Sequence, residues 1–139
     1  RHKIEIYKKI RQIDNHVNYE ELQEELMDRF GEYPDVVAYL LEIGLVKSYL
    51  DKVFVQRVER KENKITVQFE KVTKRLFLAQ DYFKALSATN LKAAIAENKG
   101  LMEVVFDVRN KKDYEILEGL LIFGESLLEI KESKEGNSL

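Results

Sequence analysis

The sequence predicts an α+β fold, with an N-terminal three-helix segment packed on an antiparallel sheet made of two hairpin–helix units. Apolar residues recur at helical spacing in the first part of the chain, and they alternate with polar residues in later segments. The chain has 139 residues, of which 45% are hydrophobic and 35% are charged, a composition typical of one globular domain. We therefore expect a single domain over residues 1–130 and a flexible polar tail over residues 131–139.

The first two predicted helices each have one apolar face. These faces consist of Ile6, Tyr7, Ile10 and Ile13 in the first helix, and of Tyr19, Leu22, Leu26 and Phe30 in the second. At about 100° per residue, Glu21, Glu24, Glu25 and Asp28 fall together on the opposite side of the second helix. Asn18, three residues before Glu21, fits the N-cap of a capping box.

A glycine and a proline separate the second helix from the third. Gly31 stands where a helix end favours a residue with positive φ, and Pro34 is suited to the first turn of the next helix. The third helix is predicted from Asp35 to about Leu50, and because it is apolar nearly all round we expect it to be buried. Gly44 within it indicates the close approach of another element.

The second half of the chain contains the strand patterns. The segments with strand-like patterns are Val53–Val58, Ile65–Phe69 and Met102–Val108, with turns at Arg60–Lys64 and Asn98–Gly100. The alanines of residues 91–96 suit a helix, but the pairing partner that follows favours a strand, which we expect here. Two further helices are predicted from their apolar residues: Leu76, Ala79, Phe83 and Leu86 in one, and Tyr114, Leu117, Leu120 and Leu121 in the other.

Composition and motifs argue against catalysis by this chain. It has no cysteine, which excludes disulfides and thiol chemistry and is compatible with a reducing cytoplasm. It has no GxxxxGK[ST] loop for ATP, and neither His2 nor His16 has a second ligand at metal spacing. We therefore expect no catalytic residue, no cofactor and no metal. No apolar run approaches a membrane span, the start is not a signal peptide, and the absence of an initial Met predicts a piece of a longer protein.

Two charged clusters are candidates for binding. Lys71, Lys74 and Arg75 lie near Phe69 and Phe77, a combination that can bind single-stranded nucleic acid, although a strand face with a solvated loop is the stronger explanation. The four carboxylates of the second helix are either a solvated face, with Glu25 and Arg29 as a local pair, or a docking surface for a cationic partner. Their mutual repulsion would be relieved by such a partner.

The stretch Glu25-Leu26-Met27-Asp28-Arg29-Phe30-Gly31, followed by Pro34, resembles the C-terminal domain of bacterial transcription-repair coupling factors. Ile6-Tyr7-Lys8-Lys9-Ile10 is similar to an upstream element of that family, so the resemblance covers roughly residues 4–50. Family members often end the third helix with a glycine, where this chain has Asp51 and Lys52.

The resemblance implies a non-catalytic regulatory domain of a DNA-repair protein. In the family, this domain docks on an N-terminal UvrB-like module and masks the surface that recruits UvrA, until the protein meets a stalled RNA polymerase. The resemblance assigns the docking contacts to Glu25 and Asp28, and Glu21 and Glu24 share their face. ATP and magnesium would belong to the motor domains of the parent, a DNA translocase. The alternatives are a generic protein-interaction module and a weak nucleic-acid-binding domain. We expect a cytoplasmic, monomeric domain without direct DNA contact.

We predict weak, nonspecific DNA binding by this chain, because its net charge is −2 and its basic residues are scattered. Fluorescence anisotropy with labelled duplex and single-stranded DNA at physiological salt measures this affinity. Submicromolar binding of either form would favour the nucleic-acid alternative instead.

Overall fold

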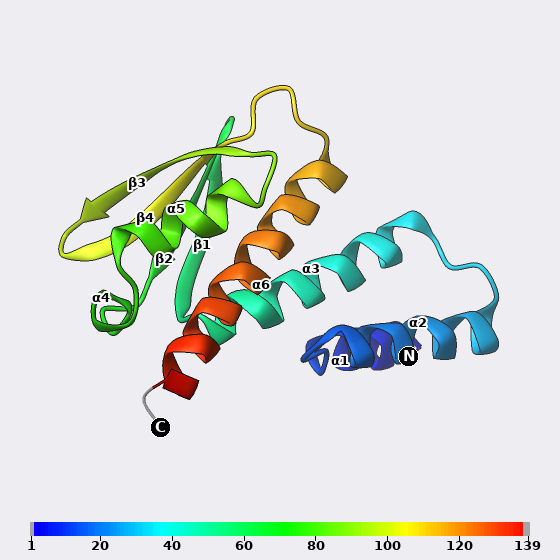
Figure 1. The fold of residues 1–139 in the computed structure, drawn as a ribbon. Helices are drawn as coiled ribbons and strands as arrows, with labels where there is room; N and C mark the ends of the chain where they lie inside the picture. The colour runs from blue at the N-terminus through cyan, green and yellow to red at the C-terminus, as the bar shows by residue number, and fades with distance from the viewer. Residues whose placement is uncertain (1, 138–139) are drawn as a thin grey trace. The chain divides into compact units, whose positions relative to one another are not determined.

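The computed structural model describes residues 2–137 and contains three helices followed by two hairpin–helix units (Figure 1). The elements are α1 (His2–Arg11), α2 (His16–Phe30), α3 (Asp35–Lys52), β1 (Val55–Lys61), β2 (Lys64–Phe69), α4 (Thr73–Leu76), α5 (Ala79–Ser87), β3 (Lys92–Asn98), β4 (Leu101–Asp107) and α6 (Asp113–Asn137). The predicted α+β class is confirmed. The chain divides into two compact units, Arg1–Tyr49 and Leu50–Leu139, with the boundary inside α3. The expected single domain over residues 1–130 stays a prediction.

The N-terminal unit is a helical assembly around a small apolar core. Its buried apolar side chains are Ile10, Ile13, Leu22, Leu26, Leu41, Leu45 and Val46. The short connection after α2 reverses the chain, so α2 and the first turns of α3 run in opposite directions (Figure 1). A Cβ atom added to Gly44 would lie 3.2 Å from the Ile10 carbonyl oxygen, which confirms the predicted close approach at this glycine.

The start of α2 differs from the predicted capping box. Asn15, not Asn18, is the N-cap, and its side-chain oxygen accepts a hydrogen bond of 2.9 Å from the Asn18 backbone N–H. The Asn18 side chain accepts in turn from the Asp14 N–H at 3.2 Å. Because Asn15 and Asn18 are both good caps three residues apart, the sequence did not distinguish them. At the other end Gly31 has φ +70° and its N–H donates to the Met27 carbonyl, as predicted.

The apolar stripe of α2 is buried for two of its members but not for Phe30. Leu22 and Leu26 are 7% and 2% exposed, whereas Phe30 is 40% exposed. The prediction that Phe30 belongs to the buried face was therefore wrong. Phe30 is the last residue of α2, and the Arg29 guanidinium carbon lies 5.3 Å from its ring centroid. Helical periodicity assigned the correct side of the helix, but the core ends one turn earlier.

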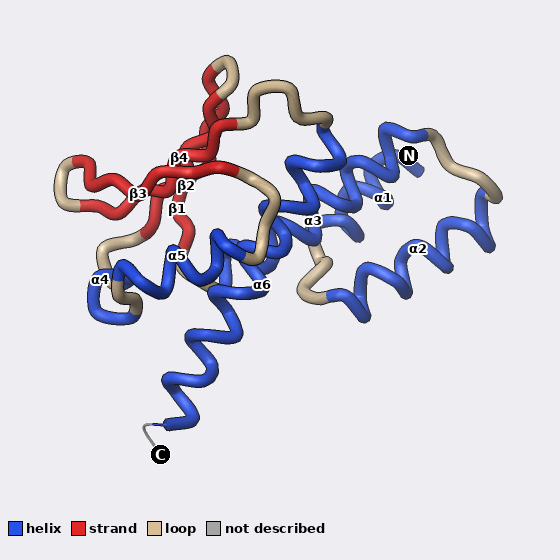
Figure 2. Tube along the Cα trace, turned by 45° about the horizontal axis from the view of Figure 1, so that its top comes forward, coloured by secondary structure: helices blue, strands red, loops and turns tan. Residues whose placement is uncertain are grey.

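The sheet of the C-terminal unit joins the two hairpins through their second strands. Its order is β1-β2-β4-β3, and every neighbouring pair is antiparallel (Figure 2). β3 confirms the strand expected over residues 91–96, and the turn at residues 99–100 matches the expected one. The turn between β1 and β2 is tighter than the predicted Arg60–Lys64 loop, since the strands end at Lys61 and resume at Lys64.

Aromatic rings fill the space between the sheet and its two long helices. Phe69 of β2 contacts Tyr82 of α5 and Phe123 of α6, and Phe106 of β4 also contacts Phe123. The ring centroids are 5.3 to 6.3 Å apart, and these pairs have edge-to-face geometry. Since Phe69, Phe106 and Phe123 are all 0% exposed, α5 and α6 cover the same face of the sheet (Figure 1).

Two apolar residues assigned to inward faces point outward. Phe83 is 58% exposed, and its neighbour Tyr82 takes the core position with 1% exposure. Tyr114 is 62% exposed at the beginning of α6, whereas Leu117 and Leu120 are buried as predicted. The prediction for Phe83 was wrong because it assumed one continuous helix from Leu76 to Leu86. The helix is instead interrupted between α4 and α5, and this interruption resets the helix phase.

Phe54, at the junction between α3 and β1, has a backbone conformation that is unusual for a bulky residue. Its φ is +64°, in the left-handed region that favours glycine. Hydrogen bonds hold both sides of this peptide: its N–H donates to the Asp51 carbonyl, and its carbonyl accepts from the Glu70 N–H at 2.8 Å. The Lys131 ammonium lies 5.7 Å from the Phe54 ring centroid. These contacts offset the cost of a conformation that typically amounts to ~1–3 kcal/mol.

The segment expected to be a flexible tail begins inside α6. Residues 131–137 are helical, and residues 138–139 lie outside the described part of the chain. Lys131 and Glu135 form an i,i+4 ion pair, and the Lys134 ammonium lies 2.6 Å from the Asp81 carboxylate of α5. These two pairs supply stabilising contacts to a sequence that by composition alone looks like a tail.

Alanine substitutions should distinguish the buried residues of the α2 apolar stripe from the exposed Phe30 by their effect on stability. Leu26→Ala is expected to lower the free energy of unfolding by about 2–5 kcal/mol, because it removes a fully packed side chain. Phe30→Ala is expected to cost less than ~1 kcal/mol, because much of that ring already contacts solvent. Denaturant midpoints for the two variants test the assignment, and equal losses would contradict it.

The Asp81–Lys134 pair should make stability depend on acidic pH. Burial alone would raise the pKa of Asp81, but the Lys134 ammonium and the Leu78 N–H more than offset this, and the net pKa is lowered. A lowered folded-state pKa stabilises the fold above the unfolded value of about 3.9, and this contribution is lost as the pH falls through the folded value.

We therefore expect Asp81→Asn to lower the free energy of unfolding by about 1–3 kcal/mol at pH 7. That difference from the unmodified chain should shrink once the pH falls below the unfolded value of about 3.9, and it should be lost as the pH falls through the lowered folded-state pKa of Asp81. Urea denaturation over a series of pH values from neutral to acidic measures it. A pH-independent difference would mean that Asp81 acts through packing rather than through its charge.

Candidate functional site

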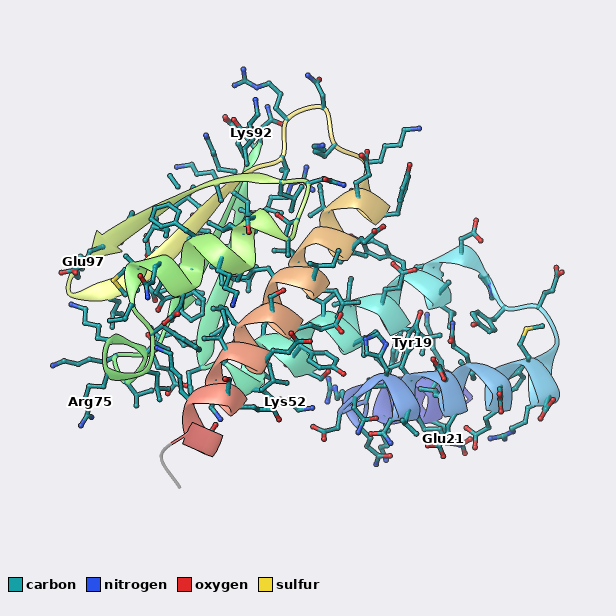
Figure 3. All side chains as sticks on the ribbon, in the orientation of Figure 1. Tyr19, Glu21, Lys52, Arg75, Lys92 and Glu97 are labelled. Carbon is teal, nitrogen blue, oxygen red and sulfur yellow. The ribbon has the colours of Figure 1, made fainter. Side chains whose placement is uncertain are left out.

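The candidate site is the surface formed by α1 and α2, where the predicted docking residues lie. Glu21, Glu24 and Asp28 are exposed on α2, and Glu25 is half-buried. Glu21 projects away from α3, whereas Tyr19 two residues earlier points toward α3 (Figure 3). Glu21, Glu24 and Asp28 therefore lie on the exposed side of α2, as the helical spacing predicted, whereas Glu25 lies at the edge of that side next to α1.

Two ion pairs connect α1 to α2 in an antiparallel arrangement. The Lys9 ammonium of α1 donates to a Glu25 carboxylate oxygen at 2.5 Å. One turn away, Arg29 of α2 lies 3.8 Å from Glu5 of α1. Glu5 and Lys9 are four residues apart, as are Glu25 and Arg29, so the two helices present matching pairs of opposite charges. Glu25 is thus paired with Lys9, and Arg29 with Glu5. Each of the two α2 residues has its ionic partner on α1, and neither depends on the predicted local Glu25–Arg29 pair.

The other three carboxylates have no such partner. Within residues 2–137, Glu21, Glu24 and Asp28 form no ion pair. Asp28 lies four residues after Glu24, and Glu24 lies three after Glu21, so all three face one another along the helix surface. The structure therefore places a net negative surface on α2 whose charge is compensated only at Glu25.

A shallow groove separates the carboxylates from α1. Its volume is about 340 Å³. The lining includes Ile13 and Leu22, which are apolar and buried, and the polar residues Lys9, Gln12, Asn18, Glu21 and Glu25. The groove thus combines an apolar floor with a charged rim, and the Lys9–Glu25 pair forms part of that rim.

Tyr19 supports this surface from the opposite side of α2. Burial raises the pKa of its hydroxyl, and Glu42 and Tyr33 act in the same direction. Its oxygen accepts a hydrogen bond from the Gln23 side chain at 3.3 Å. Because Tyr19 stays neutral and points inward, it adds no charge to the acidic surface and serves to pack α2.

The basic cluster of Lys71, Lys74 and Arg75 has no exposed aromatic ring from Phe69 or Phe77 beside it. Phe69 and Phe77 are 0% and 5% exposed, so neither ring can stack on a base. Lys74 pairs with Glu97 at 3.2 Å, and Arg75 projects into solvent from α4 (Figure 3). The structure therefore favours the interpretation of this cluster as a strand face with a solvated loop.

No group of three or more metal-ligating side chains that could hold an ion occurs in the part of the chain that the structure describes. Among the helices of residues 2–137, none combines the length and apolar character that a membrane crossing requires.

The fold and this surface define an α+β domain with a charged helical face. A family model described as the TRCF domain matches residues 1–80. The transcription-repair-coupling factor of Staphylococcus haemolyticus is 29% identical over 99 residues, which are 70% of this chain and 8% of that protein. That of Bacillus subtilis is 33% identical over 63 residues, 45% of this chain and 5% of that protein.

A solved structure extends the likeness to almost the whole chain. The crystal structure of the C-terminal domain of a transcription-repair coupling factor is 93% identical and covers 96% of this chain, which in turn spans 83% of that one, with a TM-score of 0.93. The chain belongs to the family of transcription-repair coupling factor domains and corresponds to the C-terminal domain. The resemblance found over residues 4–50 is confirmed.

Proposed function

We propose that this chain is a non-catalytic, autoinhibitory domain, which docks on the UvrB-like N-terminal module of its parent protein in the bacterial cytoplasm. The docked state masks the UvrA-binding surface of that module, and a stalled RNA polymerase triggers release. ATP and magnesium serve the motor domains of the parent, and this chain needs no cofactor. Family membership supports the placement of the domain in a much longer protein, since the chain spans 8% and 5% of the two relatives.

The observation that carries the proposal is the uncompensated charge on α2. Glu21, Glu24 and Asp28 share one exposed surface and form no ion pair within the described residues. Like charges at this spacing weaken a helix, so a cationic partner would stabilise them. Carboxylates one turn apart also suit bidentate contacts with arginine. Glu25, which the family resemblance assigns to the contact, lies at the rim of the same surface.

Charge reversal on this surface should open the full-length protein. We expect Glu24→Arg combined with Asp28→Arg to strengthen UvrA capture on the order of tenfold. Like charges across an interface cost several kcal/mol, which exceeds a typical interdomain coupling of 1–3 kcal/mol. Both side chains are exposed and lie away from the buried core of α2, so the variant should stay folded. A pull-down of UvrA at several concentrations measures the change.

The matched control reverses two exposed carboxylates elsewhere. Glu70→Arg combined with Glu129→Arg changes the net charge equally but leaves α2 intact. UvrA capture by this control should equal that of the unmodified protein. If the α2 variant is well folded by circular dichroism and captures no more UvrA than the control, the acidic surface is solvated and the proposal fails.

A further inference from the structure

We infer that Lys9 is an intramolecular competitor for the docking surface and thereby sets how tightly the domain closes. The inference rests on the proposed function. Lys9 holds Glu25, the carboxylate that the family resemblance assigns to the contact with an arginine. Its ammonium lies 2.5 Å from the Glu25 carboxylate, so Glu25 is already occupied before any partner arrives.

The geometry of the pair allows exchange. The Lys9 and Glu25 side chains are 34% and 41% exposed, so a partner cation can reach the carboxylate. An ion pair this exposed is weak, and its loss shifts an equilibrium by at most about fivefold. A guanidinium that makes two parallel hydrogen bonds binds a carboxylate better than a single ammonium does. A docking arginine can therefore displace Lys9, but the displacement reduces the net gain from docking.

The groove beside the Lys9–Glu25 pair contains a second carboxylate, Glu21, that can accept the displaced Lys9 ammonium. Lys9 and Glu25 share the rim of the groove of about 340 Å³ with Glu21, Gln12 and Asn18. Glu21 forms no ion pair in the described chain, so it can accept the ammonium when Glu25 turns to the partner. Lys9 would then remain at the interface as an adjustable counter-charge.

Removal of Lys9 should tighten closure. In the full-length protein we expect Lys9→Gln to weaken the apparent affinity for UvrA by about threefold, and by no more than about fivefold, because a smaller fraction of the protein is open. Lys8→Gln is the matched control: Lys8 is exposed on the same helix and loses the same charge. It should leave the affinity for UvrA unchanged. Lys9→Arg keeps the pair with a guanidinium that holds the carboxylate at least as well, so the apparent affinity for UvrA should not fall.

The sign of the effect separates competition from a merely structural role. If Lys9 only fastened α1 to α2, its removal would loosen the docking surface, and UvrA would bind more tightly. The Glu25→Gln background adds a second test: without the carboxylate there is nothing to compete for, so Lys9→Gln should then have no effect. Three results would each overturn the inference: tighter UvrA binding by the Lys9→Gln variant, equal UvrA binding by the Lys9→Gln and Lys8→Gln variants, or an effect of Lys9→Gln that persists in the Glu25→Gln background.

The charge-reversal variant separates this inference from the proposed function. If Glu24→Arg with Asp28→Arg increases UvrA capture while Lys9→Gln equals Lys8→Gln, the docking surface stands and the role of Lys9 is refuted. If the charge reversal has no effect either, the proposed function itself fails.

Discussion

The antiparallel pairing of β2 with β4 is the contact on which the C-terminal unit depends. It joins two hairpins that are separated in the chain by α4 and α5, and it aligns Val67 with Val104 in the middle of the sheet. Both side chains are 0% exposed. A shift of one residue between these strands would turn the apolar face of one hairpin away from the helices, so the register fixes which rings meet α5 and α6. The aromatic contacts of Phe69 and Phe106 with Phe123 follow from that alignment.

Local patterns were sufficient to predict most of the elements, because most have a clear period or punctuation, although the helix predicted over Leu76–Leu86 is interrupted between α4 and α5. The alternation in β2 and β4 and the glycine stop at Gly31 were all correctly interpreted. The patterns failed where a neighbour distant in sequence decides. Phe30 has the right helical phase, but it is the last residue of α2 and is 40% exposed. Tyr82 replaces Phe83 in the core because the helix is interrupted before α5. Phe54 adopts a left-handed conformation that its own side chain disfavours, and contacts with Asp51 and Glu70 stabilise it.

The same distinction applies to the candidate site. Helical spacing placed the four carboxylates on one side of α2, and this required no tertiary information. The partner of Glu25 could not be found that way, because Lys9 lies sixteen residues earlier and on another helix. The nearest basic residue at helical spacing is Arg29, which instead lies beside Glu5. A chain with several lysines in α1 offers several possible partners, and only the packing of the two helices selects Lys9.

This selection changes what the acidic surface can do. A surface of four equivalent carboxylates would bind cations according to charge alone, and its binding would be weakened strongly by salt. A surface with one internally paired carboxylate and three without an internal partner has sites that bind a cation with different strengths. In the proposed docking, Glu24 and Asp28 attract a cationic partner at no internal cost, whereas Glu25 becomes available only when Lys9 moves. A regulatory contact has to be reversible, and interdomain couplings of 1–3 kcal/mol are small enough for one exposed ion pair to alter the balance. The antiparallel charge pairing between α1 and α2 is therefore suited both to hold the hairpin together and to limit how strongly its acidic surface binds.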